Sequence, residues 1–326
     1  MYWWPIMTTP APTRELPYDL FAARARTTPD APALYFGEGV CTTYRDLAAR
    51  VHEVVMRLEA SGASRYVGVC LDSGPDAVTA VLAVLASGRA FVPLDPSYPP
   101  ERIGWMLEDT EANVDLTVRA LGDRIPLTSA ALVHLDEPPS GNGRLAAPAR
   151  RPGPEDPACI LYTSGSSGRP KGVIRPLRGI VARFEWLHWE PDDVFCHNMS
   201  LNVGFSQERL FIPLMLGLPL AVIPRDVYSS PRRFVTSLEA HGVTQLTLTP
   251  HTLEQILDVG PDIAKRGRHG PRGARGPVRP ASSACRAGER LRLDRIRNDR
   301  ARYARVRSLS RPGGTSRFRN GRPHPG

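Results

Sequence analysis

The alternation of apolar strand segments with an apolar helix between residues 66 and 93 most constrains what this chain can fold into. Tyr66–Leu71 and Ala90–Pro93 are short apolar runs, and Ala77–Ser87 between them has the length and composition of a buried helix. A strand that is apolar on both sides has to be covered on both faces, which is typical of parallel sheets with helices packed against them. Parallel neighbours also need a crossover connection, usually a helix. The chain is therefore predicted to have an α/β fold.

The same alternation continues on both sides of this unit. Apolar residues recur at helical spacing from Tyr44 to about Ala60, and another helix is predicted from Glu101 to Leu107. Further strands are predicted at Ala33–Phe36, Thr42–Tyr44, Val114–Leu116, Val194–His197, Leu220–Ile223 and Val243–Leu248, and further helices near Ile180–Trp189 and at Pro231–His241. The order of these elements indicates mostly parallel sheets flanked by helices.

A stretch rich in glycine and hydroxyl groups, LYTSGSSGRPKGV at residues 161–173, lies between two apolar segments that read as strands. Its candidate phosphate-binding residues are Thr163, Ser164, Gly165, Ser166, Ser167, Gly168 and Lys171. Glycines let the backbone approach a ligand closely, successive N–H and hydroxyl groups suit anionic oxygens, and the lysine adds a compact positive charge. The pattern predicts a polyphosphate cradle, although this composition is also typical of flexible linkers. It differs from the usual P-loop, in which the lysine directly follows a glycine.

This stretch closely resembles the phosphate loop of the adenylate-forming superfamily, whose usual form is TSGTTGxPKGV. Ser166 and Ser167 replace two threonines and keep both hydroxyl groups. The resemblance covers roughly residues 15–263. It implies the N-terminal part of the adenylate-forming synthetase fold, with stacked, mostly parallel sheets flanked by helices, and it implies ATP and Mg²⁺ as cofactors.

A second stretch, LASGRAFVPLDPSYPPERI at residues 85–103, resembles the amino-acid adenylation domains of nonribosomal peptide synthetases. Members of that family activate a carboxylic acid with ATP as an acyl-adenylate and load the acyl group onto the phosphopantetheine thiol of a carrier protein. The resemblance therefore implies an adenylate-forming ligase of nonribosomal peptide or related secondary-metabolite biosynthesis. Its partners would be a small carboxylic acid and a carrier protein. An acyl- or aryl-CoA ligase fragment is the alternative, since such ligases share the phosphate loop.

The stretch NMSLNVGFSQERLFIPLMLG, residues 198–217, resembles the family's acid-binding helix. On that pattern Phe205 stands where the family's aspartate holds the α-ammonium group of the substrate, and Ser206 follows it in the substrate pocket. An apolar ring cannot pair with an ammonium group, and a buried charge without a partner is costly. An aryl acid, a β-amino acid, a hydroxy or keto acid and a differently anchored amino acid all remain open, as does a Phe205 that only packs in the core.

The positive net charge of +9 belongs to the end of the chain alone. Residues 265–326 hold 19 Lys+Arg and 3 Asp+Glu, with arginine, glycine and proline dominating and too few apolar residues for a core. The chain is thus divided into a poorly ordered leader at 1–15, a partial AMP-binding adenylation domain at 16–264 and a basic, disordered tail at 265–326. A basic arm that binds nucleic acid is one interpretation of the tail.

A reading-frame error after about residue 264 is the other interpretation. Leu291-Arg292-Leu293-Asp294-Arg295-Ile296 can be encoded as CTA CGG CTC GAC CGA ATC. One nucleotide later, this sequence encodes Tyr-Gly-Ser-Thr-Glu, which matches the family's Tyr-Gly-x-Thr-Glu motif for adenine and the metal. We favour this interpretation, in which the tail has no evolved partner and binds nucleic acid at most non-specifically.

Several of the family's functional groups are missing from the sequence as written. Neither the adenine motif, the ribose-binding aspartate nor a C-terminal domain with its catalytic lysine is found, so no catalytic residue is assigned and the copy is expected to be an inactive, truncated fragment. Five scattered cysteines suggest no metal site and fit a reducing cytoplasm. No secretory signal is recognised, and the longest apolar stretch, Phe211–Ile223, is too short to span a bilayer.

Overall fold

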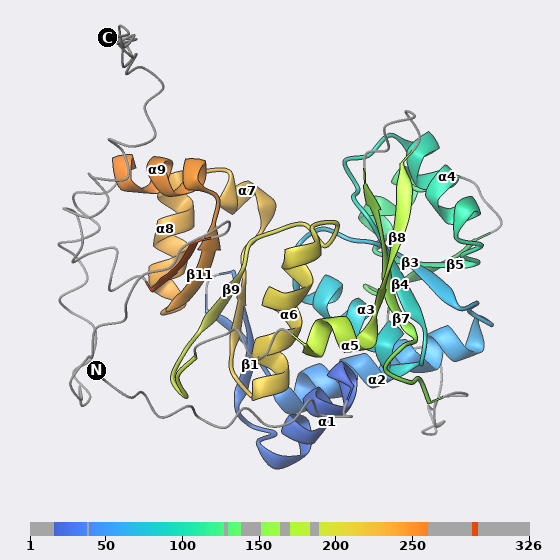
Figure 1. The fold of residues 1–326 in the computed structure, drawn as a ribbon, viewed down its shortest axis with the longest axis horizontal. Coiled ribbons are helices and arrows are strands. Elements are labelled where there is room, and N and C mark those ends of the chain that lie inside the picture. Colours follow the sequence, from blue (N-terminus) through green and yellow to red (C-terminus); the bar gives the residue numbers. More distant parts are fainter. Residues whose placement is uncertain are drawn as a thin grey trace, which may run out of the picture.

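The computed structural model describes residues 16–37, 39–126, 130–137, 151–163, 170–182, 189–259 and 289–292 (Figure 1). The predicted leader, most of the tail and the hydroxyl-rich centre of the proposed phosphate loop lie outside these residues.

Two six-stranded sheets form the framework of the described residues. The first sheet has the order β12-β11-β9-β10-β1-β2 and the second the order β6-β5-β3-β4-β7-β8. The strands of the first are β1 (Pro32–Phe36), β2 (Val40–Thr43), β9 (Phe195–His197), β10 (Leu220–Val222), β11 (Gln245–Leu248) and β12 (Glu289–Arg292). Those of the second are β3 (Tyr66–Cys70), β4 (Ala90–Leu94), β5 (Val114–Thr117), β6 (Ala131–His134), β7 (Pro157–Thr163) and β8 (Lys171–Pro176). Neighbours are parallel except at β1–β2, β11–β12 and β7–β8, which confirms the predicted mostly parallel sheets.

Helices cover both faces of each sheet, as Figure 1 shows. The layer between the sheets contains α1 (Pro17–Thr27), α2 (Tyr44–Ala60), α3 (Pro75–Ala86), α5 (Leu177–Val181) and α6 (Gly204–Leu216). α4 (Pro100–Asp109) covers the outer face of the second sheet, and α8 (Pro231–Ala240) and α9 (Pro250–Val259) cover that of the first. Two short helices, η1 (Arg119–Arg124) and α7 (Arg225–Tyr228), complete the set.

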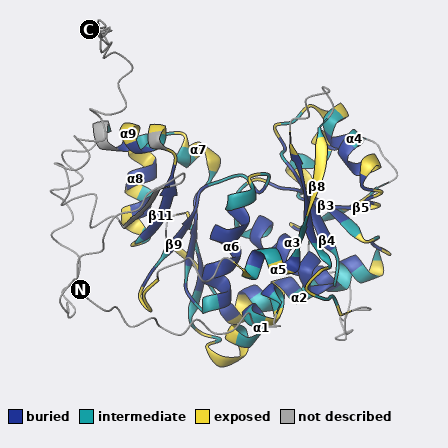
Figure 2. Ribbon diagram, in the orientation of Figure 1, coloured by how far each residue is buried: buried dark blue, intermediate teal, exposed yellow. Residues whose placement is uncertain are grey.

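This layering explains why the central strands are apolar along their whole length. In β3, Val67 and Val69 pack into the core between the sheets, whereas Cys70 packs against α4 on the other side. Figure 2 shows the central strands of both sheets as dark, buried ribbons, whereas the edge strand β8 and the outer sides of the helices are exposed. Burial on both faces removes the polar alternation of a half-exposed strand.

The hydroxyl group of Tyr44 ties the start of α2 to the end of α6. It lies 3.1 Å from the carbonyl oxygen of Leu214 and 3.0 Å from that of Leu218, and Tyr44 is fully buried. The last carbonyl groups of a helix have no partner within the helix, so a side-chain donor that reaches them stabilises its end. Burial raises the pKa of Tyr44, which keeps the hydroxyl protonated and able to donate.

Replacing Tyr44 by Phe should therefore lower the free energy of unfolding by about 1–3 kcal/mol, because buried carbonyl groups lose their donor while the ring stays. Urea unfolding followed by circular dichroism measures this change. Tyr98→Phe removes the same atom from a partly exposed residue and serves as the control. Equal midpoints for Tyr44→Phe and the parent chain would contradict the assignment.

Most predicted elements are present, and three regions differ from expectation. The helix predicted near Ile180–Trp189 is described only as α5, which ends at Val181, and residues 183–188 lie outside the described residues. The predicted strand at Thr42–Tyr44 ends at Thr43, whose hydroxyl group accepts a hydrogen bond from the Asp46 amide and caps α2. In the tail, Glu289–Arg292 departs from the expected disorder, since β12 pairs antiparallel with β11. An edge strand offers unpaired N–H and C=O groups to any extended segment, and this pairing does not require an apolar core.

Candidate functional site

The proposed phosphate loop connects β7 and β8, which form an antiparallel hairpin in which Thr163 pairs with Lys171. The Thr163 hydroxyl group donates a 3.4 Å hydrogen bond to the Lys171 carbonyl oxygen, and both residues are exposed. This confirms the prediction of a loop between two strands. It also places Thr163 and Lys171 opposite each other at the base of that loop.

The end of β7 is fixed to α4 by Tyr162. Its hydroxyl group donates a 2.6 Å hydrogen bond to Asp109, and its ring makes an edge contact with Trp105. Gly172 packs across this ring from β8, and a Cβ atom at that position would lie 3.0 Å from the Ile160 side chain. The start of the loop is therefore anchored to α4, and a side chain at Gly172 would require the Ile160 side chain to shift by a few tenths of an ångström.

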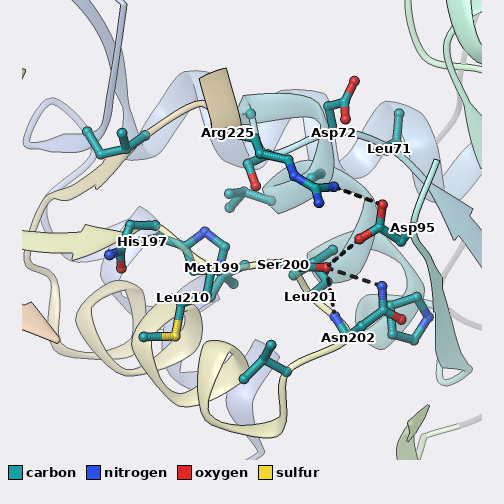
Figure 3. Close-up of a pocket in the computed structure, with 18 of the residues that line it drawn as sticks. Leu71, Asp72, Asp95, His197, Met199, Ser200, Leu201, Asn202, Leu210 and Arg225 are labelled. Carbon is teal, nitrogen blue, oxygen red and sulfur yellow. Dashed lines mark hydrogen bonds and ion pairs between the residues drawn. The ribbon is translucent and has the colours of Figure 1, made fainter. Parts of the chain in front are cut away.

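A cavity of about 330 Å³ lies between the two sheets, near the ends of their parallel strands (Figure 3). Its apolar wall includes Val69, Leu94 and Leu210, and polar groups come from His197, Asn198, Ser200, Asn202, Arg225 and Thr249. The carboxyl ends of parallel strands are where open α/β sheets usually bind their ligands. A mostly apolar cavity with a few polar groups at this edge is typical of a small-molecule site.

The loop and the cavity lie at the same edge of the second sheet. β4 and β7 are parallel, with Phe91 opposite Cys159, so that Asp95 and Thr163 each follow four residues later at the same end. Asp95 lines the cavity and Thr163 begins the loop. The cavity and the loop therefore lie at the same end of two neighbouring strands.

Asp95 joins the two sheets at this cavity. Its carboxylate accepts hydrogen bonds from Ser97, from Arg225 at 3.3 Å and from Ser200 at 3.4 Å, and Figure 3 shows Arg225 and Ser200 pointing toward it. Burial raises the pKa of Asp95, but the hydrogen bonds from Ser97 and the charge of Arg225 outweigh it and hold the pKa below its ordinary value. Asp95 is therefore an ionised group that links residues following β4, β9 and β10.

His197 at the end of β9 is buried and neutral. Its Nε2 atom lies 2.8 Å from the Ser206 hydroxyl group, and burial, together with the charge of Arg209, lowers its pKa to about 4. Its Nδ1 atom and the Asn198 Oδ1 atom have no hydrogen-bond partner within the described part of the chain, although both residues line the cavity. Buried polar atoms are nearly always paired in folded proteins, so a ligand or water that reaches these two atoms would satisfy them.

The residues predicted from the sequence are thus placed as follows. Thr163 and Lys171 lie together at the base of the loop, whereas Ser164, Gly165, Ser166, Ser167 and Gly168 lie outside the described residues. Phe205 and Ser206 lie in the first turn of α6, where Phe205 is partly buried and Ser206 is fully buried. Neither residue is among those that line the cavity, although Leu210, further along the same helix, is.

Asp95, His197, Asn198 and Arg225 were not identified from the sequence. Asp95, His197 and Asn198 stand at or directly after the end of an apolar strand, and Arg225 begins α7 three residues after β10. A polar residue at the carboxyl edge of a sheet would have been the signal. Among the described residues, no three His, Cys, Asp or Glu side chains are grouped as metal ligands. No helix in the described ranges is long and apolar enough to cross a bilayer.

Comparison with known proteins gives a consistent result. The family model for the AMP-binding enzyme matches residues 21–308, which includes part of the tail. The chain is 34% identical over 252 residues to phosphinothricin tripeptide synthetase PhsB of Streptomyces viridochromogenes, covering 74% of this chain and 21% of that protein. It is 30% identical over 270 residues to a dimodular nonribosomal peptide synthase of Bacillus subtilis, covering 78% of this chain and 11% of that protein.

Solved structures agree with these relatives. The nonribosomal peptide synthetase FmoA3 in its AMPPNP-bound form superposes with a TM-score of 0.68 at 28% identity, covering 78% of this chain and 27% of that one. A form of FmoA3 bound to alpha-methyl-L-serine-AMP gives the same TM-score and identity, over 77% and 29%. The chain spans only a small part of the length of each of these proteins. Since the family model matches most of the chain, this protein belongs to the family of AMP-binding enzymes, with the adenylation domains of nonribosomal peptide synthetases among its relatives.

Proposed function

We propose that residues 16–264 are the part of an adenylation domain that binds the phosphates of ATP and a carboxylic acid, for activation of that acid as an acyl-adenylate. The observation that carries this proposal is the position of the β7–β8 hairpin beside the cavity, at one edge of the second sheet. The AMPPNP and acyl-AMP ligands of FmoA3 support it, since that protein is similar to this chain.

The loop would hold the β- and γ-phosphates of ATP while the carboxylate attacks the α-phosphate. Thr163, Ser164, Ser166 and Ser167 would supply hydroxyl groups, Gly165 and Gly168 close backbone approach, and Lys171 a neutralising charge. Donors fixed in this way stabilise charge that develops on the leaving pyrophosphate. When Mg²⁺ is bound with ATP, it would add to the neutralising charge that Lys171 supplies.

The acid would occupy the cavity beside α6. Phe205 in the first turn of α6 cannot pair with an ammonium group, and the Asp95 carboxylate at the cavity is already engaged by Ser97, Ser200 and Arg225. We therefore propose an acid without a free α-amino group, which Asn198 and His197 can meet with neutral hydrogen bonds. The Phe205→Asp variant should bind amine-bearing acids more tightly than the parent chain does, measured by saturation-transfer NMR on a panel of acids. An unchanged order of preference would contradict this role of Phe205.

The acceptor of the acyl group would be the thiol of a carrier protein, as the peptide synthetases among the relatives suggest. We also propose that this chain alone binds phosphates without completing the reaction, because the Tyr-Gly-x-Thr-Glu motif that the family uses for adenine is not found in its sequence.

Two measurements test this proposal. Isothermal titration should detect binding of inorganic tripolyphosphate to the chain, and absence of binding would contradict the phosphate site. Acid-dependent exchange of pyrophosphate into ATP should stay at background for every acid in the panel. Robust exchange with any acid would contradict the proposed inactivity and support the enzymatic assignment at the same time.

A further inference from the structure

Arg175, on β8, joins the phosphate hairpin to the first turn of α6. Its Nη1 atom donates to the Gly204 carbonyl oxygen at 2.6 Å and to the Gln207 side-chain oxygen at 3.1 Å. Its Nη2 atom lies 3.4 Å from a carboxylate oxygen of Glu208. The Arg175 side chain is 20% exposed and that of Glu208 is 4% exposed. One guanidinium group, mostly shielded from bulk water, therefore contacts three of the first five residues of α6.

The other strand of the hairpin contacts the same helix residue. Cys159 on β7 donates a 3.2 Å hydrogen bond to the Gln207 side-chain oxygen, which also accepts from Arg175. Burial raises the pKa of Cys159 to about 12, so this group stays a thiol and a donor. Gln207 is fully buried. Both strands thus contact α6 through the side-chain oxygen of Gln207. A shift of either strand relative to α6 would break one of these two hydrogen bonds.

The contacts are of the kind that hold two elements in one relative position. Hydrogen bonds from a guanidinium group to a carboxylate are stronger than neutral ones and fix orientation as well as distance. Breaking a buried ion pair by removing one partner is strongly destabilising, since the other charge stays behind. β8 and the start of α6 are therefore expected to open together rather than separately.

Arg175 also stands in a definite relation to the phosphate loop. Side chains two apart on a strand point to the same face, so Lys171 and Arg175 lie on one face of β8. Lys171 is the first residue of β8, next to the loop, and Arg175 lies near the other end of this strand. The helical turn that Arg175 contacts also contains Ser206, which lies 2.8 Å from His197 at the cavity.

We propose that Arg175 is a positioning residue that couples occupancy of the phosphate loop to the first turn of α6 and so to the acid cavity. This coupling rests on the proposed phosphate site. A ligand that binds only when β7 and β8 are paired suppresses local unfolding of this hairpin. Through Arg175 it also suppresses local unfolding of the first turn of α6. The acid side of the cavity would then be ordered when phosphates are bound.

Hydrogen exchange with inorganic tripolyphosphate as the probe tests this coupling on the full chain. At a tripolyphosphate concentration ten times its dissociation constant, exchange in a peptide covering the first two turns of α6 should slow about tenfold, as linkage between binding and opening requires. In Arg175→Met the same peptide should slow by less than about twofold, while the dissociation constant stays within about threefold. Arg178→Met removes an equal charge from an exposed residue of α5, paired with Glu155, and should keep the full response.

Two more variants separate positioning from simple destabilisation. Arg175→Lys keeps a donor and the charge and should restore part of the response. In Arg175→Met alone, the buried Glu208 carboxylate would lose the charge of Arg175. Adding Glu208→Gln removes that carboxylate charge, so the double variant should fold stably and still lack the coupling. Retention of the tenfold response in this double variant would overturn the proposal. Tripolyphosphate binding without any change in α6 of the parent chain would overturn the coupling alone, whereas no binding at all would overturn both the coupling and the phosphate site.

Discussion

Replacing Asp115 by Asn is expected to make the stability of the chain nearly independent of pH between 5 and 8. The parent chain, in contrast, is expected to lose stability as pH rises through this range. Asp115 on β5 is fully buried opposite Gly68 of β3, and a Cβ atom on that glycine would lie 3.0 Å from the Asp115 carboxyl carbon. The Cys70 amide donates a 3.2 Å hydrogen bond to one carboxyl oxygen, and the other has no hydrogen-bond partner among the described residues. Burial raises the pKa of Asp115 from its ordinary 3.8 to about 8, although the Cys70 amide lowers it in part.

The direction of the effect follows from proton binding. Between these two pKa values the folded chain keeps the Asp115 proton and the unfolded chain loses it, so rising pH favours unfolding. The resulting stability is complete below pH 3.8 and is lost as pH rises to about 8. Each unit of pH costs up to about 1.4 kcal/mol, which makes about 4 kcal/mol an upper limit between pH 5 and 8.

Urea midpoints at several pH values measure this effect. Asp115→Asn should give a flatter curve than the parent chain, and it should be the more stable of the two near pH 8. Asp123→Asn, on an exposed residue of η1, is the control and should follow the parent curve. Parallel curves for Asp115→Asn and the parent chain would show that Asp115 is already ionised in the folded state.

Replacing Lys171 by Ala is expected to weaken binding of tripolyphosphate by about ten- to a hundredfold, because a charge-assisted contact of this kind contributes roughly 1.5–3 kcal/mol. Lys171 is exposed at the base of the loop, beside Thr163, and its side chain is not required for the pairing of β7 with β8. The unfolding midpoint should therefore change little. The loss should be the same whichever acid is present, since Lys171 is proposed to contact the phosphates and not the acid.

Titration calorimetry at two salt concentrations distinguishes a specific contact from general attraction between a basic chain and a polyanion. Arg232→Ala removes one charge from an exposed position on α8 and should leave the affinity almost unchanged at either salt concentration. If both variants lose affinity to the same small extent, and the loss disappears at higher salt, the loop is not the binding site.

The elements near these sites were predictable where periodicity is strong. The strand at Tyr66–Leu71 and the helix that starts at Tyr44 follow from local pattern, and the order of residues around 161–173 predicted a loop between two strands, whose binding of phosphate stays a prediction. The meeting of Asp95 with Arg225 could not be predicted in this way, because it depends on how two sheets stack. The same holds for Arg175, whose partners on α6 are distant in sequence and which reads as an ordinary charged residue at the edge of a sheet.

The order of strands in the first sheet has a consequence for biosynthesis. Leu34 of β1 pairs with Leu220 of β10, whereas the second sheet is built from one continuous part of the chain, β3 to β8. At a translation rate of about 5–20 residues per second, β1 waits roughly 10–40 s for its partner strand. During this time the second sheet can assemble, and the β1–β2 hairpin keeps an open edge that attracts other extended chains. A chaperone that engages the nascent chain would therefore be expected to bind this hairpin and to be released only when β10 has emerged from the ribosome.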